Sequence, residues 1–390
     1  MTGVTALVRA TARTMNTKGI LYPGELIRDM MREADITHIN NEVPFYTGCP
    51  QPDPNQKFQV FCSDPRYMEL ITDMGTDVME LSGDHFADYH AKAMYETLDI
   101  YKKNNLAYYG GGYNVEDGRK PLLMEVNGNK IMFIGCNYKT IYASARDNVP
   151  GSVPCDFPYM TQQIAYYRSQ GYLPISTYQY HEFDSPEARP QQMIDFRRMA
   201  DAGAVIVSGS QAHVPQVMEF YKGSFIHYGL GNLFFDQMVK KGPHLTENEF
   251  IDRHVFYDGR YLGVELITAR LTDYARPRYM TEAERTKFLT MYFAKSGWDF
   301  SQAGRWLSST WKNLRWIFEP LIAESQRFYG YNNGEVLLYP MYKNLSLSVI
   351  IDRLLQQSKH VVFGESILIS DQQIRAPWGE NYRHLEAVEE

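Results

Sequence analysis

The chain has 390 residues, of which 44% are hydrophobic and 22% are charged. This length and composition suit one large folded core or two ordinary ones. The net charge of −7 argues against a nucleic-acid-binding surface, which is normally basic. We expect no membrane-spanning segment, because no apolar run reaches about 18 residues, and no signal peptide.

Cysteines and aromatic residues leave two alternatives open. None of the four Cys lies in a Cys-x-x-Cys pair, which argues against a structural zinc site. Cys49 and Cys62 flank a loop rich in Pro and Gln, so they form either a disulfide in an exported protein or two free thiols in a cytosolic one. The 29 Tyr indicate either an aromatic core, the commoner case, or a cleft for sugars or peptides.

The first 42 residues predict a small-residue turn that leads into a helix within 2–13, and a second helix at 24–34. A short strand at 36–39 follows, and it ends in Asn40-Asn41-Glu42. A carboxylate directly after a buried strand is placed either to face a cleft or to cap a loop. The sequence therefore makes Glu42 a candidate without deciding between these roles.

A second polar cluster follows the next predicted strand. The pattern indicates a helix at 65–74, a strand at 76–81 and a helix at 91–104. The strand ends in Ser82-Gly83-Asp84-His85, and adjacent Asp and His can bind a metal ion, act as acid and base, or cap the helix. A strand is also expected at 106–109, before three glycines. These glycines do not match a phosphate-binding loop.

The Asn127-Gly128 pair predicts a β-hairpin between strands at 122–126 and 130–136. A helix at 159–170 should follow it. From Pro174 to Asp236 the sequence predicts an α/β unit with strands at 173–178, 204–208 and 224–228 and a helix at 189–202 that ends at Gly203. Parallel strands of this kind end at one edge of a sheet, where ligands bind.

The last third is less regular. Alternation at 263–272 predicts an edge strand, and a helix is expected at 281–294. Helices are also expected within 299–327, which is rich in Trp, and at 345–357. The polar residues from about 376 onward should be mobile.

Five of these clusters, in the same order, resemble segments of the CapA family of capsule or poly-γ-glutamate synthesis proteins, over roughly residues 1–295. Asn40-Asn41-Glu42 is similar to the family's Asn-Leu-Glu segment, and 76–89 is similar to its DVVSLANNHALDYG. Residues 110–135, including the hairpin, resemble GAG followed by GKIAFLGY. Residues 201–216 resemble DAGADVVIGHHPHVLQ, and 226–236 (IHYGLGNLFFD) resembles IFYSLGNFIFD.

The resemblance implies a layered α/β sandwich of the calcineurin-like metallophosphoesterase type, with metal ligands on loops at strand ends. Several ligand positions have changed. Val4 stands where the family has Asp, while Arg9 keeps a family Arg. Gly83-Asp84 replaces Asn-Asn before the retained His85. The family's His before Trp-Gly aligns with Tyr178, and only the last His of GHHPH remains, as His213. An ordinary two-metal centre is therefore not expected.

Two functions remain open. The first is a hydrolase with a rebuilt cleft, acting on a polymer or conjugate through an amide or glycosidic bond. Its expected catalytic residues are Asp84, Glu182, His181 and Glu42. Expected substrate contacts are Asn41, Tyr178, Tyr180, Asn232 and Arg9. A single divalent ion (Zn, Mn or Fe) held by Glu42, Asp84, His85 and His213 is one version, and metal-free acid–base chemistry is the other. The alternative function is a non-catalytic protein that binds or assembles capsule polymer.

The expected organisation is a CapA-like α/β domain at 1–298 and a helical or α+β extension at 299–390, packed on the main domain. The expected partner is a polymer or small-molecule substrate, with no nucleic acid, and an oligomer is allowed. The resemblance implies a location in the cell envelope or outside the cell.

Overall fold

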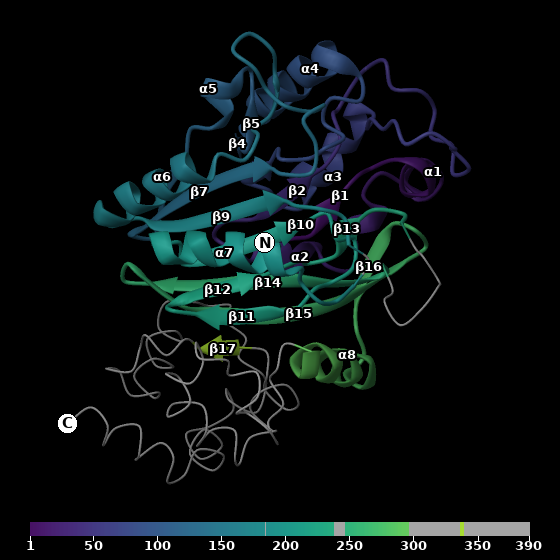
Figure 1. The fold of residues 1–390 in the computed structure, drawn as a ribbon. Helices are drawn as coiled ribbons and strands as arrows, with labels where there is room; N and C mark the ends of the chain where they lie inside the picture. Colours follow the sequence, from purple (N-terminus) through teal and green to yellow (C-terminus); the bar gives the residue numbers. More distant parts are fainter. Residues whose placement is uncertain (184, 238–245, 296–335, 339–390) are drawn as a thin grey trace, which may run out of the picture.

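Two sheets of mainly parallel strands form the centre of the fold; the computed structural model describes residues 1–183, 185–237, 246–295 and 336–338 (Figure 1). The first sheet has five parallel strands in the order β13-β1-β2-β3-β4. Their bounds are β1 (Val4–Thr5), β2 (His38–Asn41), β3 (Val78–Glu80), β4 (Ala107–Tyr109) and β13 (Asn232–Phe234). All residues of the first four strands in this order are buried, as in parallel sheets covered on both faces.

The second sheet has the strand order β11-β12-β10-β9-β7-β6. Its strands are β6 (Leu122–Val126), β7 (Asn129–Asn137), β9 (Leu173–Gln179), β10 (Ile206–Ser210), β11 (Met218–Tyr221) and β12 (Ser224–His227). The four central strands are parallel, and the two outer strands pair antiparallel. The parallel pairing of β9, β10 and β12 confirms that the strands predicted in the central stretch end at a common edge.

A third, antiparallel sheet packs beside the second. It consists of β14 (Asn248–Tyr257), β15 (Arg260–Thr272), β16 (Arg276–Tyr279) and β17 (Val336–Leu338), with β15 paired to the other three. The prediction of an edge strand at 263–272 is therefore wrong. This strand is central and most of its residues are buried, because β14 and β16, which the sequence pattern did not reveal, cover its two sides. Two short strands, β5 (Gly111–Gly112) and β8 (Gly151–Ser152), form a separate pair.

Helices cover the outer faces of the sheets. They are α1 (Arg9–Lys18), α2 (Arg28–Arg32), α3 (Met68–Asp73), α4 (His90–Lys103), α5 (Val115–Gly118), α6 (Phe157–Ser169), α7 (Pro190–Ala202) and α8 (Glu282–Lys295), with 3-10 turns at Tyr22–Gly24 and Pro65–Tyr67. Figure 1 shows α4 and α5 at one end of the molecule and α8 below the third sheet.

Three apolar clusters hold the layers together. α1, α3 and α4 pack on the first sheet, as in the contact of Leu98 with the cluster around Ile39. α6 and α7 pack on the second sheet through residues such as Phe196. Phe133 and Phe225 of the second sheet share the central cluster with residues of the third sheet and α8. The layered α/β sandwich expected from the sequence is confirmed.

Local signals at the chain's turns were accurate. The hairpin at Asn127-Gly128 is present, and both residues have positive φ (50° and 76°), as a type I′ turn requires. Gly203 ends α7 in the left-handed conformation (φ 111°). The expected helix at 24–34 is shorter, because Pro23 and Gly24 form a 3-10 turn before α2.

Strands defined by distant partners were missed. The expected turn at the start of the chain is wrong, since Val4–Thr5 is a strand between β2 and β13. A two-residue strand has no periodicity to detect, and its partner β13 begins only at Asn232. The sequence also did not reveal β11 or β14, although each pairs with the next strand in the chain.

All four cysteines form disulfides, Cys49 with Cys62 and Cys136 with Cys155. The first pairing is the disulfide that the sequence left open, and the second was not predicted. Among the described residues, no helix is long and apolar enough to cross a membrane. Apart from β17, the expected extension at 299–390, with its helices and mobile end, lies outside the described residues, so the division into two domains stays a prediction.

Candidate active site

Polar side chains from both sheets meet where the parallel strands end. Glu42 follows β2, Asp84 and His85 follow β3, and Lys139 follows β7. Gln179 ends β9, while Gln211 and His213 follow β10. Because the carboxyl ends of the strands of both sheets point the same way, these loops meet at one edge, the usual place for ligand sites in α/β folds.

Glu42 is the deepest acidic group of this cluster. Its side chain is almost fully buried (1% exposed), and Oε2 has no hydrogen-bond partner among the described residues. The amide of Gln179 donates to Oε1 across 3.5 Å. Burial, reinforced by the nearby negative charge of Asp84, raises the pKa of Glu42 to about 8. Glu42 therefore holds a proton at neutral pH.

The pKa of Asp84 is shifted in the opposite direction. Burial opposes its ionisation, but the positive charges of His85 and Lys139 outweigh burial and hold its pKa below the usual value. Lys139 Nζ lies 2.8 Å from Oδ2, and Gln179 Nε2 donates to Oδ1 at 2.9 Å. Two carboxyl groups side by side thus have different protonation states, which is the arrangement of an acid–base pair.

His85 is held as a cation. Its Nδ1 lies 2.7 Å from Asp88 Oδ2, and its Nε2 lies 3.9 Å from Asp84 Oδ2. Burial disfavours the charge, but the hydrogen bond to Asp88 and the neighbouring acidic groups prevail and raise the pKa of His85 to about 9. Phe61 covers the imidazole, with ring centroids 4.7 Å apart.

Lys139 is a site residue that the sequence did not reveal. Besides Asp84, its Nζ lies 3.5 Å from Glu182 Oε2. Burial acts against the charge, but Asp84, Glu42 and Glu182 together raise its pKa above the usual value. Lys139 lies in a loop without any motif, so only the position of β7 beside β9 brings it to the site.

Gln179 and Gln211 form the floor of the site, where their amide groups contact each other. In the orientation of the Gln211 amide that satisfies its neighbours, the nitrogen donates to Glu42 Oε1 and Asp84 Oδ1, each at 3.0 Å, and the oxygen accepts from Lys139. Gln211 has a φ of 82° and His213 a φ of 54°. Such left-handed backbone is unfavourable for these residues and is often found at functional sites.

Tyr178 faces away from this floor. Successive side chains of a strand point to opposite sides, so Gln179 reaches the site while Tyr178 packs against Phe196 in the core (ring centroids 4.7 Å apart). Tyr180 is also buried and donates a hydrogen bond to Asp195 at 2.8 Å. These placements correct the expectation that both tyrosines contact substrate. Gln179, not Tyr178, is the β9 residue that faces the cleft.

The other expected residues divide into three groups. His213 and Asn232 are buried together, with Nδ1 and Oδ1 2.9 Å apart, at the back of the site. His181 and Glu182 lie at its mouth, where the Glu182 side chain is 44% exposed. Asn41 points instead to Tyr101, to which it donates a hydrogen bond at 2.8 Å.

Arg9 is bound to Asp236 through Nε at 3.0 Å. Its guanidinium also lies over the rings of Phe61 and Phe235. The pair therefore joins the start of α1 to the segment after β13, behind the ring that covers His85.

Gly83 lies where two loops of the site touch. A Cβ at this position would collide with the Glu42 carbonyl oxygen and would lie 2.6 Å from the Glu42 Cα. No side chain fits there without moving one of the two backbones. The glycine therefore allows the loops after β2 and β3 to touch, and this contact sets Glu42 beside Asp84.

The cluster matches a metal site in size but not in charge. Glu42, Asp84 and His85 each offer a ligand atom, all within 4.8 Å of one another. However, an ammonium group already lies 2.8 Å from Asp84. The fourth expected ligand, His213, has Nδ1 directed at Asn232 and Nε2 3.4 Å from Gln211. As arranged, these residues fit an ammonium cation and do not fit an additional divalent ion.

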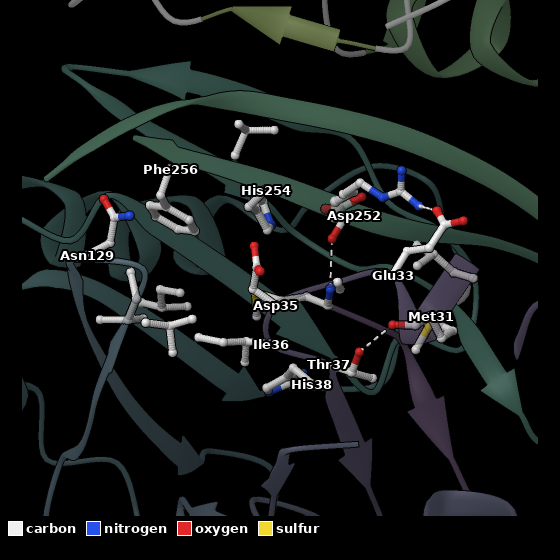
Figure 2. Close-up of a pocket in the computed structure, with 18 of the residues that line it drawn as sticks. Met31, Glu33, Asp35, Ile36, Thr37, His38, Asn129, Asp252, His254 and Phe256 are labelled. Carbon is white, nitrogen blue, oxygen red and sulfur yellow. Dashed lines mark hydrogen bonds and ion pairs between the residues drawn. The ribbon is translucent and has the colours of Figure 1, made fainter. Parts of the chain in front are cut away.

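A separate cavity of about 440 Å³ lies at the opposite, amino-terminal ends of the strands (Figure 2). It is lined by the segments 34–38 and 251–256 together with part of the β6–β7 hairpin. Figure 2 shows Asp35 and His254 beside it. None of the residues that the sequence nominated for catalysis lines this cavity.

Comparison with known proteins places the chain in a family. Residues 1–237 match the model of the bacterial capsule synthesis protein family PGA_cap. The PGA biosynthesis protein CapA of Bacillus subtilis (strain 168) is 29% identical over 237 residues, which are 59% of this chain and 60% of that protein. The capsule biosynthesis protein CapA of Bacillus anthracis is 30% identical over 176 residues, which are 44% of this chain and 43% of that protein. The aligned parts thus span less than two thirds of either relative.

Solved structures give weaker likenesses. A hypothetical protein from Thermus thermophilus has a TM-score of 0.42 at 15% identity, covering 70% of this chain and 98% of that one. A 5′-nucleotidase precursor from the same organism also has a TM-score of 0.42, at 12% identity, covering 73% of this chain and 54% of that one. Both scores are low, and neither likeness bears on function. With 237 of its 390 residues matched, the chain belongs to the bacterial capsule synthesis (PGA_cap) family.

Proposed function

We propose that this chain is a hydrolase that cleaves an amide or glycosidic bond of a capsule polymer by carboxyl acid–base chemistry without a metal ion. The observation that carries the proposal is the meeting of Glu42, Asp84 and Lys139 at the carboxyl edge of the two sheets. Membership of a capsule synthesis family supports a polymeric substrate.

The geometry assigns a role to each group. Glu42 is protonated and has a buried oxygen, Oε2, without a partner among the described residues, so it can donate a proton to the leaving nitrogen or oxygen. Asp84 is ionised, and its carboxylate can attack the substrate to form a covalent intermediate that water then hydrolyses, or it can stabilise the positive charge of a glycosidic transition state to which water adds. Lys139 and His85 keep Asp84 ionised, and Gln179 orients both carboxyl groups.

The mouth of the site suits an anionic polymer despite the net charge of the chain. Lys139 lies between the buried carboxylate of Asp84 and the exposed Glu182. Arg189 donates a hydrogen bond to the Glu182 carbonyl oxygen at 3.3 Å and covers the Phe183 ring. These cations, together with His85, supply local positive charge for the free carboxylates of a polymer such as poly-γ-glutamate.

The disulfides support a location in the cell envelope or outside the cell. Such bonds persist in oxidising compartments, and both lie close to the site. Cys62, bonded to Cys49, follows Phe61, the ring that covers His85. Cys136, bonded to Cys155, lies in β7 shortly before Lys139. A capsule polymer is found in the same compartment.

A binding role without turnover is the second candidate. It is favoured by the fully buried amides of Gln179 and Gln211, which fill the floor of the site with groups that neither donate protons to nor attack a substrate. A binder would hold the polymer with measurable affinity and release no product.

The test is to incubate the chelator-treated protein with poly-γ-glutamate and with capsular polysaccharides, and to quantify new amino groups and reducing ends. We expect turnover, and at least about a 100-fold loss in Glu42→Gln and in Asp84→Asn. Asp201→Asn is the matched control, because Asp201 also pairs with a lysine, Lys222, at 2.7 Å but is remote from the site. Polymer binding without product, or unchanged rates in both site variants, would refute the proposal.

A further inference from the structure

The Glu42–Asp84–His85 cluster has the construction of a metal site into which a lysine has been inserted. We propose that the ammonium group of Lys139 is the resident cation of this cluster and takes the place of a divalent ion, so that native protein excludes metal and a variant without the ammonium binds it. This inference concerns the binding of metal and stands whether or not the site is catalytic.

The ammonium group is coordinated as a bound cation would be. Its nitrogen lies 2.8 Å from Asp84 Oδ2 and 3.5 Å from Glu182 Oε2. The first distance is that of a charge-assisted hydrogen bond. In the orientation of the Gln211 amide that satisfies its neighbours, its side-chain oxygen also accepts from this nitrogen. Oxygens from three separate loops therefore converge on one nitrogen.

His85 retains the support that metal-binding histidines have. Asp88 holds its Nδ1 at 2.7 Å and so directs Nε2 towards Asp84. A carboxylate on the far nitrogen is the usual way in which proteins orient a histidine ligand. With Glu42 and Asp84 it completes three ligand atoms within 4.8 Å of one another. What separates this cluster from a metal site is thus the cation already present.

The charges explain why the ammonium group of Lys139 and a divalent ion exclude each other. Lys139 and His85 already face Asp84, so the cluster has no surplus negative charge to hold an added ion. A divalent ion would have to displace the ammonium group, because two neighbouring positive charges repel each other strongly in a buried site. The remaining neighbours, Gln179 and Gln211, are neutral amides, which are weak ligands for Zn²⁺ or Mn²⁺.

The test is calorimetric titration of chelator-treated protein with Zn²⁺ and, separately, with Mn²⁺ at about pH 7. We expect wild type to show no saturable site, and Lys139→Met, which keeps the apolar stem, to bind one ion per chain at least tenfold more tightly than wild type. Lys139→Arg, which keeps the charge, should behave as wild type. Lys222→Met is the matched control, because it breaks an equally short lysine–aspartate pair far from the cluster.

Circular dichroism establishes that each variant is folded before it is titrated. If Lys139→Met does not fold, Lys139→Gln, which keeps a hydrogen-bond donor for Asp84, replaces it with the same expected result. Stoichiometric binding by wild type would overturn the inference, and so would a lysine variant that binds metal no better than wild type. Absence of hydrolysis would affect only the proposed function, since this titration does not depend on turnover.

Discussion

Replacement of Glu42 by Gln should make the protein more stable while it removes the proton donor. The folded chain holds the pKa of Glu42 at about 8, whereas an unperturbed glutamate has a value of 4.5. At pH 7 the unfolded chain has therefore lost a proton that the folded chain keeps. Each pH unit above 4.5 costs the folded state about 1.4 kcal/mol up to pH 8, so the penalty at pH 7 is about 3 kcal/mol.

The sign of the pH dependence follows from the raised pKa. Wild type should lose stability as pH rises from about 4.5, where the unfolded chain begins to ionise, to about 8, where the folded chain does. The amide in the E42Q variant cannot ionise, so the variant lacks this loss. The gain over wild type should be close to zero at about pH 4 and about 3 kcal/mol at about pH 7. Urea denaturation of both proteins at these two pH values measures it.

Glu182→Gln is the control for this experiment. Glu182 is 44% exposed and lies at the mouth of the same site, so its replacement should change stability by no more than about 0.5 kcal/mol at either pH. An E42Q variant that is less stable than wild type at pH 7, or a gain independent of pH, would show that Glu42 is not a buried, protonated group.

Three further predictions concern the framework of the site. Gly83→Ala should impair folding or activity, since its Cβ would lie 2.6 Å from the Glu42 Cα; a soluble, fully active variant would contradict the close contact of the two loops. Joint replacement of Cys49 and Cys62 by Ser should cost about 3 kcal/mol, as expected for a loop of this length, and thermal or urea unfolding measures it. Arg197→Met should cost about 3–5 kcal/mol, because it leaves the buried Glu219 without the two hydrogen bonds at 2.8 and 2.7 Å; a loss under about 1 kcal/mol in urea unfolding would contradict the pairing.

The parts of the fold that depend on local chemistry could be predicted from the sequence. Asn127-Gly128 specifies a hairpin by its tolerance of positive φ, and Gly203 ends a helix for the same reason. Parts that depend on distant partners could not: Val4–Thr5 is a strand because β2 and β13 lie beside it. β15 alternates as an edge strand does, but its neighbours in the chain, β14 and β16, pair on its two sides and make it central.

The site shows the same division. Glu42, Asp84 and His85 could be predicted because each follows a strand that is apolar and buried, and the structure brings all three together. The prediction chose Tyr178 instead of the next residue, Gln179, and adjacent residues of a strand face opposite sides. The alternation of side chains along the strand could therefore have identified Gln179.

Lys139 could not have been predicted in this way. It lies in a loop of no recognisable motif, and its role depends on a contact with Asp84, which follows a strand of the other sheet. No periodicity or spacing links the two positions. A long, flexible side chain of this kind can reach many places, and the packing of β7 against β9 decides which one it reaches.

The measurement that tests the central claim most directly is the release of new end groups from capsule polymer by the protein after exhaustive chelation, with E42Q measured beside it at equal concentration. We predict that chelated wild type cleaves the polymer at the same rate as the untreated protein, and that E42Q is folded but inactive. Activity that disappears on chelation and returns with added metal, or an active E42Q, would contradict an acid–base site built on Glu42, Asp84 and Lys139.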